Sequence, residues 1–178
     1  MPTFIAFLRA VNVGKRQYPM AELREALITA GFEEVETYIQ TGNVRFRTTM
    51  RSREKVVAAL ERAMRADRGF EVSVVLLTPA ELREAYDEAV AFADGRELQG
   101  HYLTLVARPM SAEGTALIEG GSGDGEEVRV GARTVHLMLT SKPYSEATRA
   151  SAEAERHLGV ATTRSLTVIT KLNEKWSS

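Results

Sequence analysis

The sequence predicts an α+β protein of two ferredoxin-like (βαββαβ) units packed together, the second less regular than the first. Over residues 3–77 the apolar pattern follows strand and helix spacing in the order strand, helix, strand, strand, helix, strand, which is the ferredoxin-like order. Residues 101–158 repeat this order without a clear final strand. The chain has 178 residues, 44% hydrophobic and 26% charged, which suffices for one ordinary domain or two small ones.

The first ferredoxin-like unit is expected to span residues 1–78. Short apolar runs rich in β-branched and aromatic residues predict its strands at 3–9, 35–39, 44–48 and 70–77. Pro19 and Gly31 mark the two ends of a helix with apolar residues at helical spacing. Ser52 is a suitable N-cap for a second helix with one apolar stripe. In this topology the first and third strands lie in the centre of the sheet, and both helices cover one face.

Residues 79–100 are expected to form a helix and a linker, followed by a second, incomplete ferredoxin-like unit at residues 101–178 with a C-terminal helix. The tetrapeptide Thr78-Pro79-Ala80-Glu81 has the pattern of a capping box with proline at the first helical position. The polar stretch 92–100 is the expected boundary between the units.

Within the second unit, strands are expected at 101–107, 126–130 and 134–139, and helices at 111–119 and 145–158. The turn Gly131-Ala132-Arg133 joins the last two strands as a hairpin. Residues 165–172 fit either a helix or a strand, and the spacing of Leu166, Ile169 and Leu172 favours a helix.

Composition and charge favour a cytoplasmic protein. The net charge of -1 creates no global field that would attract nucleic acid or a membrane. The absence of cysteine excludes disulfides, thiolate metal sites and a cysteine nucleophile. The apolar run Phe4–Leu8 is too short for a signal-peptide core, and no segment approaches the roughly 18 apolar residues of a membrane-spanning helix.

Polar residues at the ends of predicted elements form the candidate ligand-binding site. They come from the stretches 8–16, 38–43 and 162–165, where regular structure gives way to loops. The candidate residues are Arg9, Asn12, Gln40, Asn43 and Arg164. Arginine binds phosphate or carboxylate with two parallel hydrogen bonds, and the amides orient polar ligands. The alternative is structural: the same residues would fix the loops and join the two units.

The same stretches carry a family resemblance. The opening Leu8-Arg9-Ala10-Val11-Asn12-Val13-Gly14 resembles a Leu-Arg-Gly-Ile-Asn-Val-Gly pattern, and the turn Thr37-Tyr38-Ile39-Gln40-Thr41-Gly42-Asn43 continues it. Together with Thr163-Arg164-Ser165 near the end, these motifs resemble the bacterial family called domain of unknown function 1697. The resemblance implies a pair of ferredoxin-like units and no activity. Ala10, Lys15 and Ser165 differ from the residues usual in that pattern, which are Gly, Gly and Asn.

The amino-acid sequence leaves the function unknown. The leading hypothesis is that the protein is a binding module for a small anionic or polar ligand. One alternative is a cofactor-free enzyme in which Arg9 or Arg164 polarises a substrate. Another is an RNA- or protein-interaction module. RNA binding is disfavoured because Arg45 and Arg47 occupy the strand face where RNA-binding ferredoxin-like domains place aromatic residues.

No cofactor and no metal site are expected. His101, His136 and His157 lack ligand spacing and have no acidic cluster beside them in the sequence. His136 alternates in face with Val135 and Leu137 and is expected to be an ordinary hairpin residue. An edge strand in either unit makes a homodimer possible.

Overall fold

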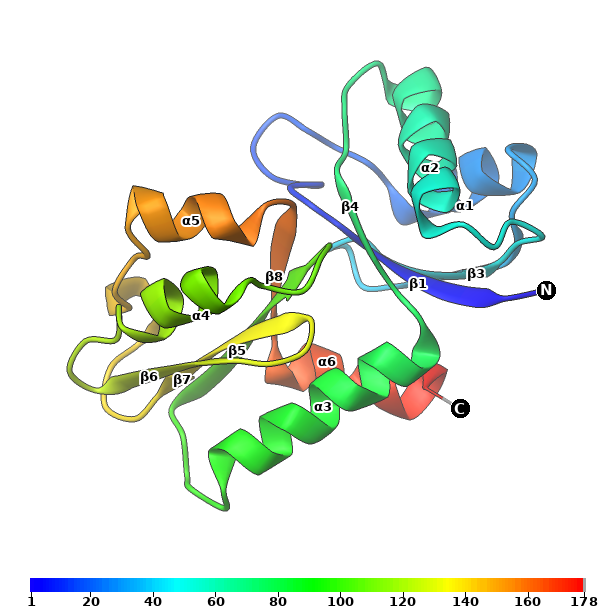
Figure 1. Ribbon diagram of the computed structural model, residues 1–178. Helices are drawn as coiled ribbons and strands as arrows, with labels where there is room; N and C mark the ends of the chain where they lie inside the picture. The colour runs from blue at the N-terminus through cyan, green and yellow to red at the C-terminus, as the bar shows by residue number, and fades with distance from the viewer. Residues whose placement is uncertain (178) are drawn as a thin grey trace. The chain divides into compact units, whose positions relative to one another are not determined.

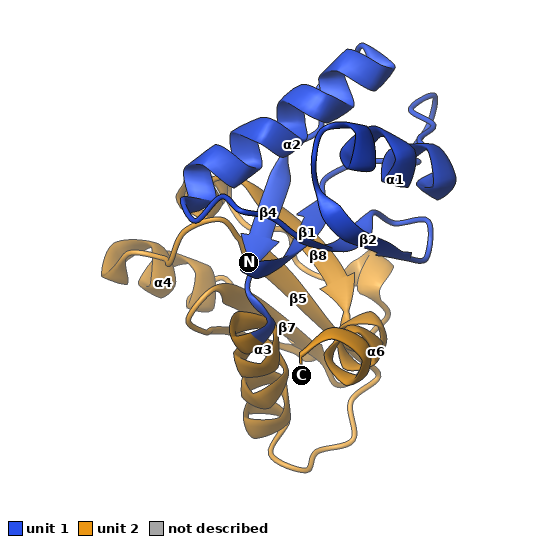
Figure 2. Cartoon of the chain, turned by 90° about the vertical axis from the view of Figure 1, so that its right-hand side faces the viewer, with its two compact units in different colours: residues 1–79 blue, residues 80–178 orange. Residues whose placement is uncertain are grey.

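The computed structural model describes residues 1–177, and the chain divides into two compact units after Pro79 (Figure 2). The elements of the first unit are β1 (Thr3–Leu8), α1 (Met20–Thr29), β2 (Glu33–Tyr38), β3 (Asn43–Arg47), α2 (Arg53–Arg68) and β4 (Val74–Leu77). Their strands form an antiparallel sheet in the order β2-β3-β1-β4. The first and third strands therefore lie in the centre, as the sequence predicts.

The core of the first unit lies between this sheet and its two helices. Phe4 pairs with Phe46 in the β1–β3 register, and Phe32 packs edge-on against Phe46 at 5.0 Å between ring centroids. Leu23 of α1 and Leu60 of α2 close the core from the helix side and are 0% and 1% exposed. Ser52 caps α2 by accepting a hydrogen bond from the Lys55 backbone, as predicted.

The second unit repeats the topology with extra helices. Its elements are α3 (Pro79–Ala93), β5 (Gly100–Val106), α4 (Ala112–Glu119), β6 (Glu126–Val130), β7 (Thr134–Leu139), the 3₁₀ turn η1 (Tyr144–Glu146), α5 (Ala152–Leu158), β8 (Ala161–Ser165) and α6 (Leu166–Trp176). The antiparallel sheet has the order β6-β7-β5-β8, which matches the first sheet position for position. The α+β class and the two ferredoxin-like units are confirmed.

The structure corrects three details of the sequence interpretation. The second unit has a final strand, because residues 161–165 pair with β5 instead of forming a loop. The helix expected from Ser145 begins only after its N-cap Ser151, so α5 is about half the expected length. The units divide before α3 and not at residues 92–100, because Glu88 on α3 bonds to Ala132 and Thr134 of the second unit.

Helices cover both faces of the second sheet. Figure 1 shows α4 and α5 on one face and α3 and α6 on the other. Because both faces are covered, β7 is buried along most of its length. The sequence segment 165–172, which fitted either state, contributes Ser165 to β8 and continues as helix α6, with Trp176 buried near its end. Within residues 1–177 no helix has both the length and the hydropathy to cross a membrane.

Candidate functional site

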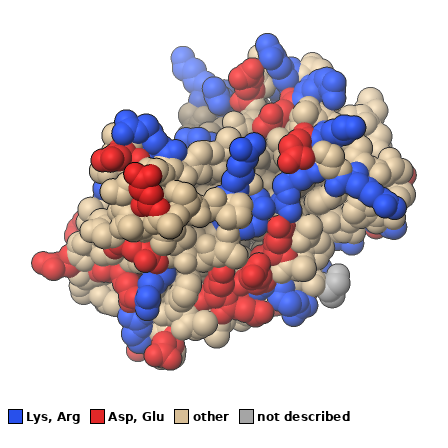
Figure 3. All heavy atoms as spheres, in the orientation of Figure 1, with Lys and Arg blue, Asp and Glu red and all other residues tan. Residues whose placement is uncertain are grey.

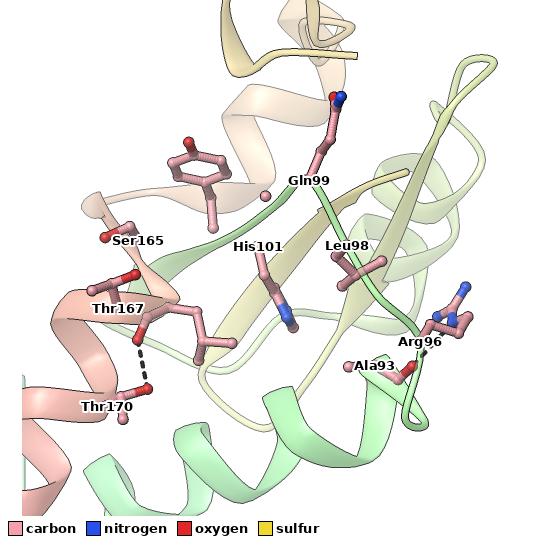
Figure 4. A pocket seen from close by; sticks show the side chains of 11 residues that line it. Ala93, Arg96, Leu98, Gln99, His101, Ser165, Thr167 and Thr170 are labelled. Carbon is pink, nitrogen blue, oxygen red and sulfur yellow. Dashed lines mark hydrogen bonds between the residues drawn. The ribbon is translucent and has the colours of Figure 1, made fainter. Parts of the chain in front are cut away.

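A cavity of about 470 Å³ opens in the second unit where α3 ends, β5 begins and α6 begins. Its size lies within the range of small-molecule sites, roughly 300–1,000 Å³. Figure 4 shows the His101 side chain in the middle of the lining residues, between Leu98 on one side and Thr167 and Thr170 on the other. A titratable imidazole ring therefore lies among the residues that line the cavity.

The His101 imidazole has one engaged nitrogen and one free nitrogen. The residue is 7% exposed, so water scarcely reaches the ring. Its Nε2 atom lies 3.0 Å from Nδ1 of His136. Its Nδ1 atom is buried and has no hydrogen-bond partner in the described part of the chain. A buried polar atom without a partner costs about 1–3 kcal/mol, so such an atom on a residue that lines a cavity marks a candidate place for a ligand group.

A chain of hydrogen bonds runs from Glu88 on α3 to this ring. The Thr134 hydroxyl donates to Glu88 Oε2 over 2.6 Å. The same hydroxyl oxygen lies 2.8 Å from His136 Nε2, and His136 Nε2 lies 3.4 Å from Glu88 Oε2. We call these four residues, Glu88, Thr134, His136 and His101, the histidine relay.

The relay fixes which nitrogen of His101 is bare. The single hydroxyl proton of Thr134 is given to Glu88, so the oxygen accepts from His136, whose Nε2 must carry a proton. In neutral His136 the other nitrogen, Nδ1, is then an acceptor, and it takes the Nε2 proton of His101. Neutral His101, a residue that lines the cavity, consequently carries its lone pair on Nδ1.

Electrostatics support neutral His101 beside an ionised Glu88. Burial, together with the nearby His136 and Arg96, lowers the pKa of His101 to about 4, so the ring is uncharged at neutral pH. Burial alone would raise the pKa of Glu88, but hydrogen bonds from His136, Thr134 and Ala132 outweigh burial and lower it. Gly131 makes room for this carboxylate, since a Cβ there would collide with it and with the Thr134 hydroxyl.

Two other polar side chains around the cavity, those of Arg96 and Thr170, form hydrogen bonds within the protein. Arg96 donates to Glu127 over 2.7 Å and to the carbonyl oxygens of Phe92 and Ala93, and its hydrogen bond lowers the pKa of Glu127. The Thr170 hydroxyl donates to the carbonyl of Leu166. Among the described residues that line the cavity, His101 has the buried side-chain nitrogen without a hydrogen-bond partner, Nδ1.

The sequence-predicted residues of the opening loop lie in the first unit. The structure brings Asn12 and Gln40 together: the Asn12 amide donates to the Gln40 carbonyl over 2.7 Å and to the Tyr18 carbonyl over 3.0 Å. Asn12 Oδ1 in turn accepts from the Tyr18 backbone N–H over 2.7 Å. All the strong hydrogen-bonding capacity of the Asn12 side chain is therefore used to hold the loop 9–18 against the turn 38–43.

Asn43 and its neighbours shape the same turn. The Asn43 amide is fully buried and donates to the Tyr38 carbonyl and the Thr41 hydroxyl, both over 3.0 Å. Gly42 lies so close to Leu8 and Val11 that a Cβ would collide with both. The amide is thus part of the turn's internal structure.

The two predicted arginines have different surroundings. The Arg9 side chain is exposed at the end of β1. Arg164 belongs to the second unit, where it is 8% exposed on β8 and donates to the Thr162 hydroxyl and the Thr163 carbonyl over 2.9 Å each. Burial lowers the pKa of Arg164 to about 10, which leaves it charged at neutral pH.

Comparison with known proteins identifies the family. The family described as "Protein of unknown function (DUF1697)" matches residues 1–136. This chain belongs to that family. The match includes all four residues of the histidine relay and ends at the last of them, His136. The resemblance noted in the opening motifs is confirmed.

A solved structure extends the likeness over the whole DUF1697 chain. The conserved bacterial protein SP0830 from Streptococcus pneumoniae is similar with a TM-score of 0.80 and 25% sequence identity, covering 100% of this chain and 99% of that protein. No protein with a curated description matches this chain. The glycine usual at position 10 of the DUF1697 pattern now has a physical reason, because Ala10 here has φ +54°, a conformation in which glycine carries no steric cost.

The arginines considered for RNA binding are neutralised within the first sheet. Arg47 pairs with Glu34 over 2.6 Å, and Arg45 pairs with Glu36 over 3.1 Å. On the molecular face seen in Figure 3, basic and acidic side chains are interspersed. Each of these two guanidinium groups on β3 is therefore paired with a carboxylate on β2.

Sequence reasoning missed the histidine relay. His101 and His136 are 35 residues apart, and the sequence predicts an ordinary hairpin residue at His136. In the structure α3 and α6 cover the face of β7 that carries His136, and the register pairs Leu103 with His136, which places the two rings diagonally across β5 and β7. The signal was present in the two predicted strands, each with one histidine, but their register could not be read from the sequence. Within residues 1–177 no group of three or more potential metal-ligating side chains is found.

Proposed function

We propose that this protein binds a small polar molecule in the cavity of the second unit, and that the ligand donates an N–H or O–H hydrogen bond to His101 Nδ1. The observation that carries the proposal is the buried, unpartnered Nδ1 nitrogen of a residue that lines a cavity of about 470 Å³. A ligand that donates to it gains a hydrogen bond and removes the cost of an unsatisfied acceptor. The cytoplasmic location expected from the sequence stays part of this proposal.

The site favours a polar ligand over an anionic one. The carboxylate of Glu88 lies at the far end of the relay and makes the interior negative. The one arginine that lines the cavity, Arg96, already binds Glu127. An anionic ligand would face a lone pair at His101 without a free guanidinium to offset it. A ligand with one or more N–H or O–H donors fits better, for example an amide, an amine or a polyol.

The opening-loop site at Arg9, Asn12, Gln40, Asn43 and Arg164 stays a prediction. The internal hydrogen bonds of Asn12 and Asn43 support a structural role for the two amides. Arg9 and Gln40 are the exposed members of this set and are the most open to a ligand.

A second candidate is a cofactor-free enzyme that uses His101 as a base. If Nδ1 accepts a proton from a substrate, Nε2 can release its own proton to His136 Nδ1, 3.0 Å away. The positive charge then rests on His136 beside the Glu88 carboxylate, which stabilises it. The relay therefore lets a ring with a low pKa act as a stronger base than it would be alone.

A ligand screen with two His101 variants tests the proposal. Nucleobases, amino acids, amides and sugars are screened by thermal shift, and each hit is repeated with His101→Phe and His101→Asn. His101→Phe keeps the ring shape but removes Nδ1, and we expect it to weaken binding at least about tenfold, the loss expected for one hydrogen bond to a buried group. His101→Asn keeps a polar atom close to the Nδ1 position, so it should retain part of the affinity.

The comparison of the two variants separates the possible outcomes. Hits that bind His101→Phe as well as the natural protein would overturn the cavity as the binding site. Hits that are lost in both variants while both remain folded would show that the position of Nδ1, and not only an acceptor, is required. Conversion of a hit to product, abolished by His136→Asn with binding retained, would favour the enzyme.

A further inference from the structure

We propose that the opposite face of the second sheet holds a separate site for a medium-chain carboxylate. A cavity of about 320 Å³ lies there beneath α4 and α5. It is lined by side chains of β5, β6 and β7 that face away from His101, such as Thr104, Val128 and Leu137. The site is therefore distinct from the relay cavity.

The lining of this cavity is mostly aliphatic. Leu117 and Ile118 of α4, Leu158 of α5, and Val135 and Leu137 of β7 all face it. Ile118 and Val135 are buried, whereas Leu117, Leu137 and Leu158 remain partly exposed. Apolar cavities of this kind exclude water and bind apolar groups.

A comparison of the two units explains why the space is empty. In the first unit the core between the sheet and its two helices contains large side chains, among them Phe32, Phe46 and Met64. In the second unit the buried cluster under α4 and α5 consists of Ile118, Val135 and Ala154. Ala154 is the one buried residue of α5, and its methyl group fills little of the space between helix and sheet.

The rim of the cavity supplies a cation. Arg149 lines it, is exposed, and forms no ion pair with any other described residue. The nearest polar neighbours along the chain, Thr148 and Ser151, also line it and carry hydroxyl groups. An arginine at the mouth of an aliphatic cavity suits a ligand with an apolar chain and one carboxylate, since the guanidinium binds carboxylate with two parallel hydrogen bonds.

The volume sets the chain length. If each non-hydrogen atom takes about the 30 Å³ that a water molecule occupies in the liquid, the cavity holds about ten of them. Octanoate, with eight carbons and two oxygens, is the probe of that size. Butyrate is too short to fill the cavity, and 1-octanol has nearly the same chain without the charge.

Titration calorimetry with octanoate, 1-octanol and butyrate tests the proposal. We expect octanoate to bind at one site per chain and butyrate to bind more weakly. Arg149→Gln should weaken octanoate about tenfold and leave 1-octanol unchanged, because only the carboxylate meets the guanidinium. Ala154→Leu should weaken both ligands at least about tenfold while raising the melting temperature, because the added carbons fill the cavity. His101→Phe should change neither.

Methyl NMR of the unaltered protein gives a test that no variant's folding can confuse. Octanoate should shift the methyl signals of Leu117, Leu137 and Leu158 and leave those of the first unit unchanged. Absence of octanoate binding would overturn the proposal, as would equal binding by Arg149→Gln. Undiminished binding by a folded Ala154→Leu would place octanoate elsewhere and would also overturn it.

Discussion

Replacement of Glu126 by glutamine should lower the free energy of unfolding of the second unit by about 3 kcal/mol at neutral pH. The Glu126 side chain is 1% exposed and lies at the start of β6. It accepts hydrogen bonds from the backbone N–H groups of Gly123 and Thr148 and from Lys142 Nζ, each over 2.9 Å. A glutamine has one acceptor oxygen for these donors and leaves Lys142 without its counter-charge.

The pH dependence of this effect follows from the pKa. Burial alone would raise the pKa of Glu126, but the hydrogen bonds from Thr148, Lys142 and Gly123 outweigh burial and lower it from 4.5 to about 2. A lowered pKa in the folded state gives stability that is complete above the unfolded value of 4.5 and is lost as the pH falls toward 2. The difference between the natural protein and Glu126→Gln should shrink over that same window.

Urea unfolding followed by tryptophan fluorescence measures this directly. The chain has one tryptophan, Trp176, which is 2% exposed in the second unit, so its signal reports the unfolding of that unit. Glu97→Gln is the matched control, since Glu97 is exposed in the loop after α3 and should change stability by less than about 0.5 kcal/mol. Equal stability of Glu126→Gln and the natural protein at pH 7 would show that the three hydrogen bonds contribute nothing.

Replacement of Asn12 by alanine should destabilise the first unit by about 3 kcal/mol. Three hydrogen bonds are lost, each contributing about 1 kcal/mol. Asn12 also has φ +54°, a left-handed conformation that asparagine tolerates better than alanine. If Asn12 instead served only a ligand, its removal would cost the free protein little.

Hydrogen exchange of the β1 and β3 backbone amides measures this loss in the first unit. Gln40→Ala is the matched control, because Asn12 binds the backbone carbonyl of Gln40 while the Gln40 side chain is exposed. We expect Asn12→Ala to speed the slowest exchange strongly and Gln40→Ala to leave it nearly unchanged. Unchanged exchange in Asn12→Ala would return this amide to the list of candidate ligand-binding groups.

Local sequence signals were sufficient for most of the fold. The hairpin predicted at residues 126–130 and 134–139 has those bounds in the structure, and the cap at Ser52 forms as expected. These features depend on neighbours in sequence, such as a turn residue or an N-cap. The repeated order of elements was then enough to predict the first sheet and three of the four strands of the second.

Features that depend on tertiary pairing could not be predicted in the same way. The residues of β8 are polar, with Thr162 and Arg164 buried on one face, and only their pairing with β5 makes them a strand. The segment 145–158 has alanines at helical spacing and was predicted to be one helix. In the structure the helix begins only at Ala152, after the N-cap Ser151. Alanine spacing by itself carries little packing information.

The candidate site shows the same limit. The opening motifs were singled out because polar residues follow strands, and the structure shows Asn12 and Asn43 bonded within the loops that they shape. His136 was expected to be an ordinary hairpin residue because it alternates in face with the apolar residues Val135 and Leu137. The buried relay exists because a helix outside the ferredoxin-like pattern, α3, brings Glu88 to that face.

Nitrogen-15 NMR of the histidine side chains tests the central claim most directly. At about pH 8, above the usual histidine pKa of about 6.5, we predict that His101 and His136 each carry their proton on Nε2. The His101 Nδ1 signal should be that of a bare nitrogen, and it should move toward the hydrogen-bonded position when a ligand found by the screen is added. A proton on Nδ1 of His101 in the free protein would contradict the relay and remove the acceptor on which the proposed binding site depends.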